Sequence, residues 1–471
     1  MNLPNYKDAQ KRKKNYQRIE YKADKDLKNK YSNKTYHIKT YGCQMNEHDT
    51  ENIKAMLEEL GFKEEKNMED SDLVLLNTCS IRENAHNKAY GMLGRLKHIK
   101  ETKKDLIVGI CGCMAQEEGV INEILDNYKW VNFVIGTHNL YNLSKVIEES
   151  IEKNKQEIEV FSKEGDLIEG MPVKRANNYK AYVNIIYGCD KFCTYCIVPY
   201  TRGGERSRKK EDILKEINEL VKDGFKEVTL LGQNVNAYGK DLYKDYGLGE
   251  LLEDVAKTNI PRIRFITSHP WDFSDHMIDL IAKYDNIMPS IHLPLQSGSS
   301  KILKLMGRRY SKESYLELVK KIKNKIPNIS LSTDIIVGFP QETEEDFKET
   351  LEVAEICKYD NAFTFIYSPR ENTPAAKLKD DITLEEKEKR LYKLNDLVNK
   401  YFLENNKKLI GTTEEVLIEG LSEKHNGKYY GYTKSNKLIN VIGENIEIGS
   451  IVEVEITDAK TWSLDGKLLN R

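Results

Sequence analysis

The sequence lacks any apolar run close to the ~18 residues that a membrane-spanning helix needs, and its amino end is polar and lysine-rich, without the apolar core of a signal peptide. It also has little net charge. The 73 Lys and Arg nearly balance the 75 Asp and Glu, so any nucleic-acid site must depend on local patches. Eight cysteines without a secretory signal predict free thiols in a reducing compartment, available for metal, and not a disulfide framework. We therefore expect a soluble, cytoplasmic protein with no membrane partner.

Basic residues gather at the amino end. Residues 1–34 contain eleven Lys or Arg against four Asp or Glu, with few aliphatic side chains. This composition predicts a disordered tail, which either holds RNA phosphates loosely or is simply solvated. The length of 471 residues suggests roughly three domains.

Cys189, Cys193 and Cys196 form a C-x3-C-x2-C triplet with no fourth cysteine nearby. Structural zinc normally takes four protein ligands, whereas a four-iron cluster held by three cysteines keeps one iron open for an outside ligand. The next residues, 197–208, are polar, contain glycines and carry three arginines, which suits a loop over an anionic ligand. The triplet therefore predicts an iron–sulfur site, and a structural metal knuckle is the alternative.

Residues 35–151 alternate short apolar runs with amphipathic segments, a pattern that predicts a parallel sheet with helices on its faces. Three of the predicted strands, at 37–41, 73–76 and 106–110, run into cysteines: Cys43, Cys79 and Cys113. Because parallel strands end at one edge of a sheet, these cysteines can converge on one point. Cys111 shares the third turn, but Cys113 is preferred because it lies later, at the strand-to-helix turn. Cys357 lies in a helical run and is predicted to be core.

Residues 152–178 have mixed charge and no strong period, which predicts a linker. Residues 179–407 again alternate strands and helices, and six such units predict an incomplete (β/α)6 TIM-like barrel with the triplet on its first carboxyl-end loop. The strands are predicted at 181–187, 227–231, 262–267, 290–295, 329–337 and 361–367.

Residues 408–471 lose the helical pattern, and short strands between Gly-containing turns predict a small antiparallel β-barrel. In this segment Lys424, Lys428, Lys434 and Lys437 interleave with tyrosines, a mixture that can hold phosphates and stack unpaired bases. The alternative is an ordinary solvated hairpin with core tyrosines.

The chain as a whole, from about residue 35 to 471, resembles the radical S-adenosylmethionine methylthiotransferases. The resemblance rests on the triplet and on further motifs in one order: YGCQMN (41–46), NTCSIRENA (77–85), GCMAQ (112–116), IVPYTRG (197–203), LLGQNVN (230–236), HLPLQSG (292–298) and STDIIVGFP (332–340). It implies an α/β chain with an amino-terminal methylthiotransferase domain, a radical core and a carboxy-terminal TRAM domain that binds RNA.

The resemblance also implies the site residues. Cys43, Cys79 and Cys113 would hold an auxiliary [4Fe-4S] cluster, and Cys189, Cys193 and Cys196 would hold the radical [4Fe-4S] cluster. Gly232, Gln233 and Asn234 occupy the place where the wider class binds the methionine amino end of S-adenosylmethionine, and Tyr195 sits where an aromatic residue lies near the adenine. No further catalytic side chain is assigned.

The implied reaction is methylthiolation of C2 of N6-(dimethylallyl)adenosine beside the anticodon of tRNA, using two S-adenosylmethionine molecules. Its partners would be the tRNA anticodon loop, a flavodoxin- or ferredoxin-type electron donor and a sulfur source, with the protein acting as a monomer. The nearest alternatives apply the same chemistry to threonylcarbamoyladenosine in tRNA or to an aspartate of a ribosomal protein. A non-catalytic, metal-containing RNA-binding protein is the alternative from another class.

Overall fold

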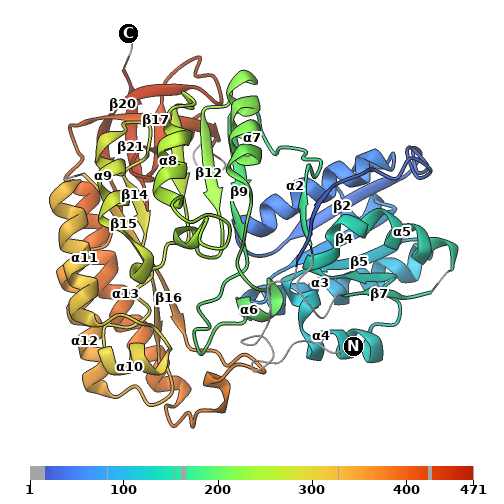
Figure 1. Ribbon diagram of the computed structural model, residues 1–471, viewed down its shortest axis with the longest axis horizontal. Coiled ribbons are helices and arrows are strands. Elements are labelled where there is room, and N and C mark those ends of the chain that lie inside the picture. Colours follow the sequence, from blue (N-terminus) through green and yellow to red (C-terminus); the bar gives the residue numbers. More distant parts are fainter. Residues whose placement is uncertain are drawn as a thin grey trace. The chain divides into compact units, whose positions relative to one another are not determined.

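The structure is a computed structural model that describes residues 16–81, 83–153, 155–160, 166–326, 328–422 and 427–469 (Figure 1). The chain divides into two units. The first comprises Met1–Ala176, Tyr187–Phe192 and Cys196–Arg206, and the second comprises Asn177–Ile186, Cys193–Tyr195 and Ser207–Arg471. Within the described ranges, no helix is both long and apolar enough to span a bilayer.

A six-stranded sheet, parallel throughout, forms the first unit. Its strands, in spatial order, are β3 (Lys63–Glu64), β2 (Thr35–Thr40), β4 (Leu73–Thr78), β5 (Ile107–Gly112), β6 (Phe133–Ile135) and β7 (Glu157–Glu159). The remaining elements are α2 (Gln44–Glu59), α3 (Glu83–Thr102), α4 (Glu118–Asn127), α5 (Leu143–Glu152), α6 (Val198–Thr201) and the 3-10 turns η1 (Met68–Asp70), η2 (Cys113–Gln116) and η3 (Thr137–Asn142). The expected strand–helix alternation is confirmed.

The alternation of side chains along the strands explains why helices cover both faces of this sheet. In β4, Leu73 and Leu75 pack with α2 and α5, while Val74 and Leu76 pack with α3 and α4. Both faces are therefore apolar, as buried parallel strands require.

Two predictions about the flanks of this sheet were wrong. Residues 1–15 lie outside the described part, but within the predicted tail β1 (Arg18–Glu20) pairs in parallel with β8 (Leu167–Glu169), and Leu27 and Tyr31 are buried against α2 and α5. The predicted linker supplies β8 and the edge strand β7. The strongly charged composition of these segments gave no indication of ordered structure, because their order depends on partners far away in the sequence.

The second unit contains the six parallel strands expected of an incomplete barrel, arranged as two three-stranded sheets. The first has the order β13 (Arg262–Phe265), β12 (Glu227–Leu231), β9 (Lys180–Asn184), and the second has β14 (Ser290–His292), β15 (Ser330–Val337), β16 (Asn361–Ile366). A parallel bridge between Ile263 and Ile287 lies at the break between them. The helices are α7 (Lys210–Lys222), α8 (Leu248–Ala256), α9 (Asp275–Lys283), α10 (Ser300–Leu305), α11 (Lys312–Lys325), α12 (Glu344–Cys357) and α13 (Leu384–Lys407), with 3-10 turns η4 (Val235–Ala237), η5 (Pro270–Asp272) and η6 (Ala375–Lys377). Short strands β10 (Ile186–Tyr187) and β11 (Arg206–Ser207) pair on either side of the triplet segment.

The carboxy-terminal residues close into a five-stranded barrel, with the order β17 (Thr413–Leu421), β18 (Tyr429–Thr433), β19 (Leu438–Ile442), β21 (Leu464–Leu468), β20 (Ile451–Ala459). The prediction of a wholly antiparallel barrel needs one correction, because β19 and β21 pair in parallel. The sequence did not predict strand β21. The fully buried Arg262, the first residue of β13, attaches this barrel to the parallel strands by donating to the Glu415 carboxylate and the Tyr432 carbonyl.

Candidate cluster and cofactor sites

Cys43, Cys79 and Cys113, called here the strand-end trio, follow the carboxyl ends of three adjacent strands. The register of the sheet sets Thr40 of β2 beside Asn77 of β4, and Asn77 beside Cys111 of β5. Each cysteine of the trio lies two or three residues beyond this row. Cys43 caps α2, Cys79 follows β4, and Cys113 opens η2. The predicted convergence on one edge of the sheet is thus present.

Two further observations bring the trio close together. A Cβ added to Gly42 would lie 2.8 Å from the Cβ of Cys79, so the turn before Cys43 touches Cys79. Burial raises the pKa of the Cys113 thiol to about 12, opposed by the neighbouring Arg202 guanidinium and reinforced by the thiols of Cys79 and Cys43. Each member of the trio therefore lies within electrostatic reach of Cys113.

The turns of the trio are fixed by a buried amide network and by a glycine. Asn46 Nδ2 donates to Asn77 Oδ1 and to the Thr78 carbonyl, while Asn77 Nδ2 donates back to the Asn46 carbonyl. These bonds tie the start of α2 to the end of β4. Gly112 has φ +91°, and a Cβ there would lie 2.3 Å from the Thr78 carbonyl oxygen, so the turn that delivers Cys113 requires glycine.

Cys111 belongs to the core of the first unit. It is fully buried in β5 and packs in the cluster that includes Ile53, Phe133 and Ile135. Burial raises the pKa of its thiol well above the usual value, and the groups that also act on it are Asp49, Arg202 and Cys113; neither Cys43 nor Cys79 is among them. This geometry favours Cys113 as the third member of the trio.

Arg202, which follows the triplet in the chain, is one of the site residues that the sequence did not predict. Its guanidinium is buried within the first unit, where Nε donates to Cys113 Sγ at 3.0 Å and Nη2 donates to the Asp49 carboxylate at 2.6 Å. Asp49 comes from α2, six residues after Cys43. The only indication of this arginine in the sequence was the presence of three arginines after the triplet. Of the other two, Arg206 donates to the Arg202 carbonyl, and Arg208 pairs with Glu216.

The fit of an iron–sulfur cluster to the strand-end trio can be tested on the donor set. Three thiols and a guanidinium lie at one sheet edge, and the buried Ser80 hydroxyl beside Cys79 has no hydrogen-bond partner. Among the described residues, no three His, Cys, Asp or Glu side chains form a set that could hold a single metal ion. Soft thiolates with a cationic neighbour are the environment in which protein iron–sulfur clusters are held, so the residues present fit the group.

The triplet is anchored residue by residue. In the first unit, the Cys189 amide donates to the Gly203 carbonyl. In the second unit, Cys193 is buried, and Arg308 Nη1 donates to its Sγ at 3.5 Å. Thr194 donates from its amide to the Met306 carbonyl and from its hydroxyl to the Leu305 carbonyl. Cys196 is partly exposed. One cysteine of each set thus accepts a hydrogen bond from a buried arginine.

The four residues predicted to bind S-adenosylmethionine lie at two places in the second unit. Tyr195 packs against the apolar cluster of Met306, Phe339 and Tyr367. Gly232, Gln233 and Asn234 directly follow β12.

Two details of the β12 turn suit a ligand with an amino group. A Cβ on Gly232 would lie 2.4 Å from the Ile186 side chain, so the backbone of this turn passes too close to Ile186 for any residue but glycine. Asn234 is buried, its Nδ2 donates to Asp272, and its Oδ1 has no hydrogen-bond partner. A buried, unsatisfied acceptor at this turn can accept an N–H from an ammonium group.

The lysines predicted to hold RNA phosphates in the carboxy-terminal barrel are engaged with acids. Lys428 pairs with Asp465, Lys434 with Glu415, and Lys437 with Asp360; Lys424 lies outside the described residues. The charge of these lysines is largely compensated, so they give little support to the predicted phosphate-binding patch.

Comparisons with known proteins cover nearly the whole chain. Residues 35–136 match an uncharacterized protein family, UPF0004; residues 183–354 match the radical SAM superfamily; and residues 407–469 match the TRAM domain. The tRNA-2-methylthio-N(6)-dimethylallyladenosine synthase of Bacillus cytotoxicus is 52% identical over 469 residues, which cover 99% of this chain and 92% of that protein. The synthase of the same name from Staphylococcus aureus is 52% identical over 471 residues, covering 99% and 91%.

Solved structures share the fold at low sequence identity. The radical S-adenosylmethionine methyltransferase TsrM from Kitasatospora setae, with tryptophan and a S-adenosylmethionine analogue bound, gives a TM-score of 0.51 at 13% identity, covering 76% of this chain and 74% of that one. Its structure with cobalamin and a [4Fe-4S] cluster gives 0.50 at 12% identity, covering 76% of each chain. These likenesses concern the fold alone.

Proposed function

This chain belongs to the tRNA-2-methylthio-N(6)-dimethylallyladenosine synthase family, and from that membership we propose that it attaches a methylthio group to C2 of N6-(dimethylallyl)adenosine in tRNA. The observation that carries the proposal is 52% identity over nearly the full length of both chains. All three family matches also occur in one order along the sequence.

We assign the strand-end trio to an auxiliary [4Fe-4S] cluster and the triplet to a radical [4Fe-4S] cluster. The support for the first is the convergence of three strand ends and the contact from Arg202 to Cys113 Sγ. The support for the second is the spacing of the three cysteines and the contact from Arg308 to Cys193 Sγ. When bound, the clusters and S-adenosylmethionine would supply sulfur transfer and radical abstraction of hydrogen from an unactivated carbon, which no acid or base side chain can achieve at neutral pH.

The side chains of the protein would hold and orient these groups. Arg202 offers a positive charge and an N–H to one thiolate of the strand-end trio, and Asp49 fixes the guanidinium in place. Arg308 does the same for Cys193. Asn234 Oδ1 would accept an N–H from the amino group of S-adenosylmethionine, with Gly232 and Gln233 beside it. Tyr195 would pack against the adenine from its apolar cluster.

The partner of the enzyme is tRNA. We propose that the target adenosine is unstacked from the anticodon loop, because a base inside a stack cannot reach a buried site. We further propose a flavodoxin- or ferredoxin-type electron donor, an external sulfur source and a monomeric enzyme, all on the strength of the family resemblance. Since the substrate is tRNA, we propose that the protein works in the cytoplasm.

Mass spectrometry of tRNA nucleosides from cells with and without this gene tests the proposed reaction. We expect 2-methylthio-N6-(dimethylallyl)adenosine to disappear without the gene and its unmethylthiolated precursor to accumulate. If that nucleoside is unchanged and a methylthiolated threonylcarbamoyladenosine is lost, the substrate assignment is wrong. If no nucleoside or ribosomal-protein modification changes, and reduced protein releases no 5′-deoxyadenosine from S-adenosylmethionine, the protein is no enzyme of this class.

A further inference from the structure

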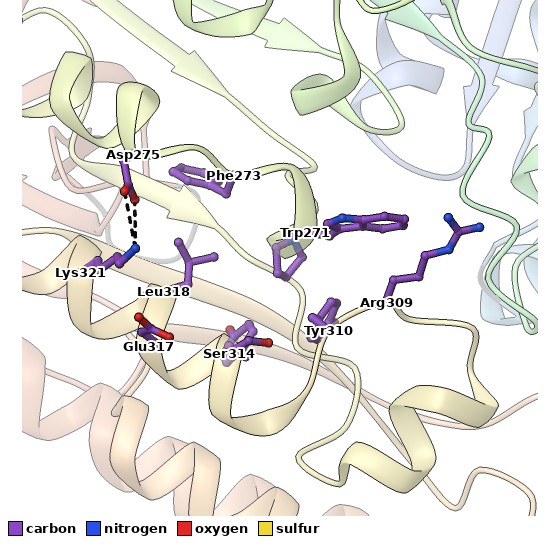
Figure 2. Close-up of a pocket in the computed structure, with 11 residues that line it drawn as sticks. Trp271, Phe273, Asp275, Arg309, Tyr310, Ser314, Glu317, Leu318 and Lys321 are labelled. Atoms are coloured by element: carbon purple, nitrogen blue, oxygen red, sulfur yellow. Dashed lines mark hydrogen bonds and ion pairs between the residues drawn. The ribbon is translucent and has the colours of Figure 1, made fainter.

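The second unit contains a cavity of about 280 Å³ that no assigned group uses (Figure 2). Its walls come from η5 and the residues after it, the start of α9, the loop before α11, and the first turns of α11. The loops on either side of η5 and of α10 follow β13 and β14. They therefore belong to the carboxyl-end face, where barrels of this kind carry their sites. The volume is close to the lower bound of the roughly 300–1,000 Å³ typical of ligand sites, which suits one small group.

Trp271 and Arg309 lie together at one end of the cavity, and this pair is called here the cationic platform. The indole of Trp271 remains 43% exposed, and the guanidinium of Arg309 lies over it with Cζ 4.6 Å from the ring centroid. Figure 2 shows the two side chains next to each other at one end of the cavity. Arg309 is itself exposed and makes no ion pair among the described residues. An exposed aromatic ring and a guanidinium without a carboxylate partner are the surfaces on which unpaired bases stack.

The opposite end carries both signs of charge. Asp275 and Lys321 form an ion pair there at 3.4 Å, and Figure 2 shows Glu317 and Ser314 between this pair and Tyr310. Two carboxylates against one ammonium group disfavour a phosphate at this end. They suit the edge of a nucleobase, which presents both N–H donors and ring or carbonyl acceptors.

The middle of the cavity is connected to the triplet through two side chains, Tyr310 and Arg308. Tyr310 lines the wall, and its hydroxyl accepts a hydrogen bond from Arg308 Nε at 3.0 Å. Arg308 in turn donates to Cys193 Sγ at 3.5 Å. A base held on the platform would therefore lie close to the cysteine segment that the proposed reaction uses.

We infer that this cavity binds one unpaired nucleoside of the RNA substrate, stacked on Trp271 and Arg309. The inference rests on the proposed function for the identity of the RNA. The nucleoside would be a neighbour of the modified one in the loop, and its capture would fix the position of the loop over the reaction site.

Binding of an anticodon stem–loop RNA that contains N6-(dimethylallyl)adenosine tests the inference directly, by fluorescence anisotropy with the reconstituted holoenzyme. We expect Trp271→Ala to weaken binding about tenfold and Trp271→Phe to retain most of the affinity, because loss of one base–aromatic stack has an effect of this size. Arg309→Ala should weaken binding less than Trp271→Ala. Tyr392→Ala is the matched control, since Tyr392 is a 67% exposed aromatic residue of α13 and lies outside the cavity. Binding by Trp271→Ala within twofold of the unsubstituted protein overturns the inference.

A second readout covers the case in which Trp271→Ala disturbs folding. The protein has three tryptophans, so the double variant Trp130→Phe with Trp462→Phe leaves Trp271 as the only indole. Stacking of a base should quench its fluorescence on titration with RNA, and no quenching at saturating RNA overturns the inference. Failure of the proposed function is recognised separately: the unsubstituted enzyme would then yield no methylthiolated nucleoside, whatever the binding data show.

Discussion

Cys43, Cys79 and Cys113 are separated by 36 and 34 residues and come from three strand ends, whereas Cys189, Cys193 and Cys196 lie within one segment of eight residues. The strand-end trio is positioned by the whole sheet, by the Asn46–Asn77 network and by the turn at Gly112. The triplet depends on a short loop anchored through backbone contacts such as Thr194 with Met306. The first site is thus a property of the fold and the second a property of local spacing.

The two sites nevertheless share one feature, an arginine that donates a hydrogen bond to a cysteine sulfur. Arg202 contacts Cys113 and Arg308 contacts Cys193, each through a buried guanidinium. A hydrogen bond and a positive charge next to a cluster sulfur stabilise the additional electron of the reduced state. We therefore expect each arginine to raise the reduction potential of the cluster proposed beside it, whatever the arrangement of the cysteines.

The largest expected effect comes from removing one cysteine of each group. Cys193→Ala should lose one of two [4Fe-4S] clusters and abolish 5′-deoxyadenosine formation. Cys113→Ala should also lose one cluster, but 5′-deoxyadenosine should still form while the methylthiolated product disappears. Iron and sulfide content together with chromatography of the nucleosides measure both outcomes. If Cys113→Ala also abolishes 5′-deoxyadenosine formation, the two groups do not act as separate sites.

Replacement of the two arginines should give the next largest effect. Arg202→Gln leaves the Asp49 carboxylate buried without its partner, so the free energy of unfolding should fall by about 3–5 kcal/mol. The reduction potential of the auxiliary cluster should also fall, since a cationic donor is lost. Arg308→Gln should lower only the potential of the radical cluster.

Denaturant unfolding and redox titration followed by electron paramagnetic resonance check these expectations. Arg202→Lys is the control for charge: it retains the positive charge but cannot reach both partners at once. A potential of the auxiliary cluster that is unchanged in Arg202→Gln would contradict the role given to this arginine.

The comparison also explains which features the sequence could predict. Parallel strands were predicted with close boundaries, as for β12 (Glu227–Leu231), because periodicity is a local property. The triplet was evident from spacing alone, and the strand-end trio from the repetition of cysteines at strand ends. Arg202 was missed as a contact of Asp49 because the two are 153 residues apart, and no local pattern distinguishes a guanidinium that reaches a distant carboxylate from one in solvent.

Two other features were not predicted, for related reasons: the ordered structure of residues 16–34 and strand β21. Leu27 and Tyr31 are isolated apolar residues among charges, and their burial depends on α2 and α5. In β21 the apolar residues are interrupted by Asp465, Gly466 and Lys467, and the strand exists because β19 and β20 pair with it from either side. Nonlocal pairing of this kind leaves a weak trace in the sequence.

A smaller effect is expected at the turn that delivers Cys113. Gly112→Ala places a Cβ against the Thr78 carbonyl at positive φ, so the free energy of unfolding should fall by roughly 1–3 kcal/mol and the iron content of the auxiliary site should decrease. Gly94→Ala is the matched control, because Gly94 lies in α3 and a Cβ there meets nothing within 4 Å. That variant should gain up to about 1 kcal/mol. Equal iron content in Gly112→Ala and the unsubstituted protein would mean that the turn tolerates a side chain.

The smallest effect separates the two neighbouring cysteines of β5 and η2. Cys111 packs in the core of the first unit, so Cys111→Ala should lower the free energy of unfolding by about 1 kcal/mol while both clusters keep their iron. Cys357→Ala, at another fully buried core position, should behave in the same way in the second unit. Thermal unfolding and iron analysis of the two variants give the comparison. If Cys111→Ala loses one cluster while Cys113→Ala keeps its iron, the third ligand of the auxiliary cluster is Cys111 and not Cys113. That ligand would then come from within β5 and not from the turn after it.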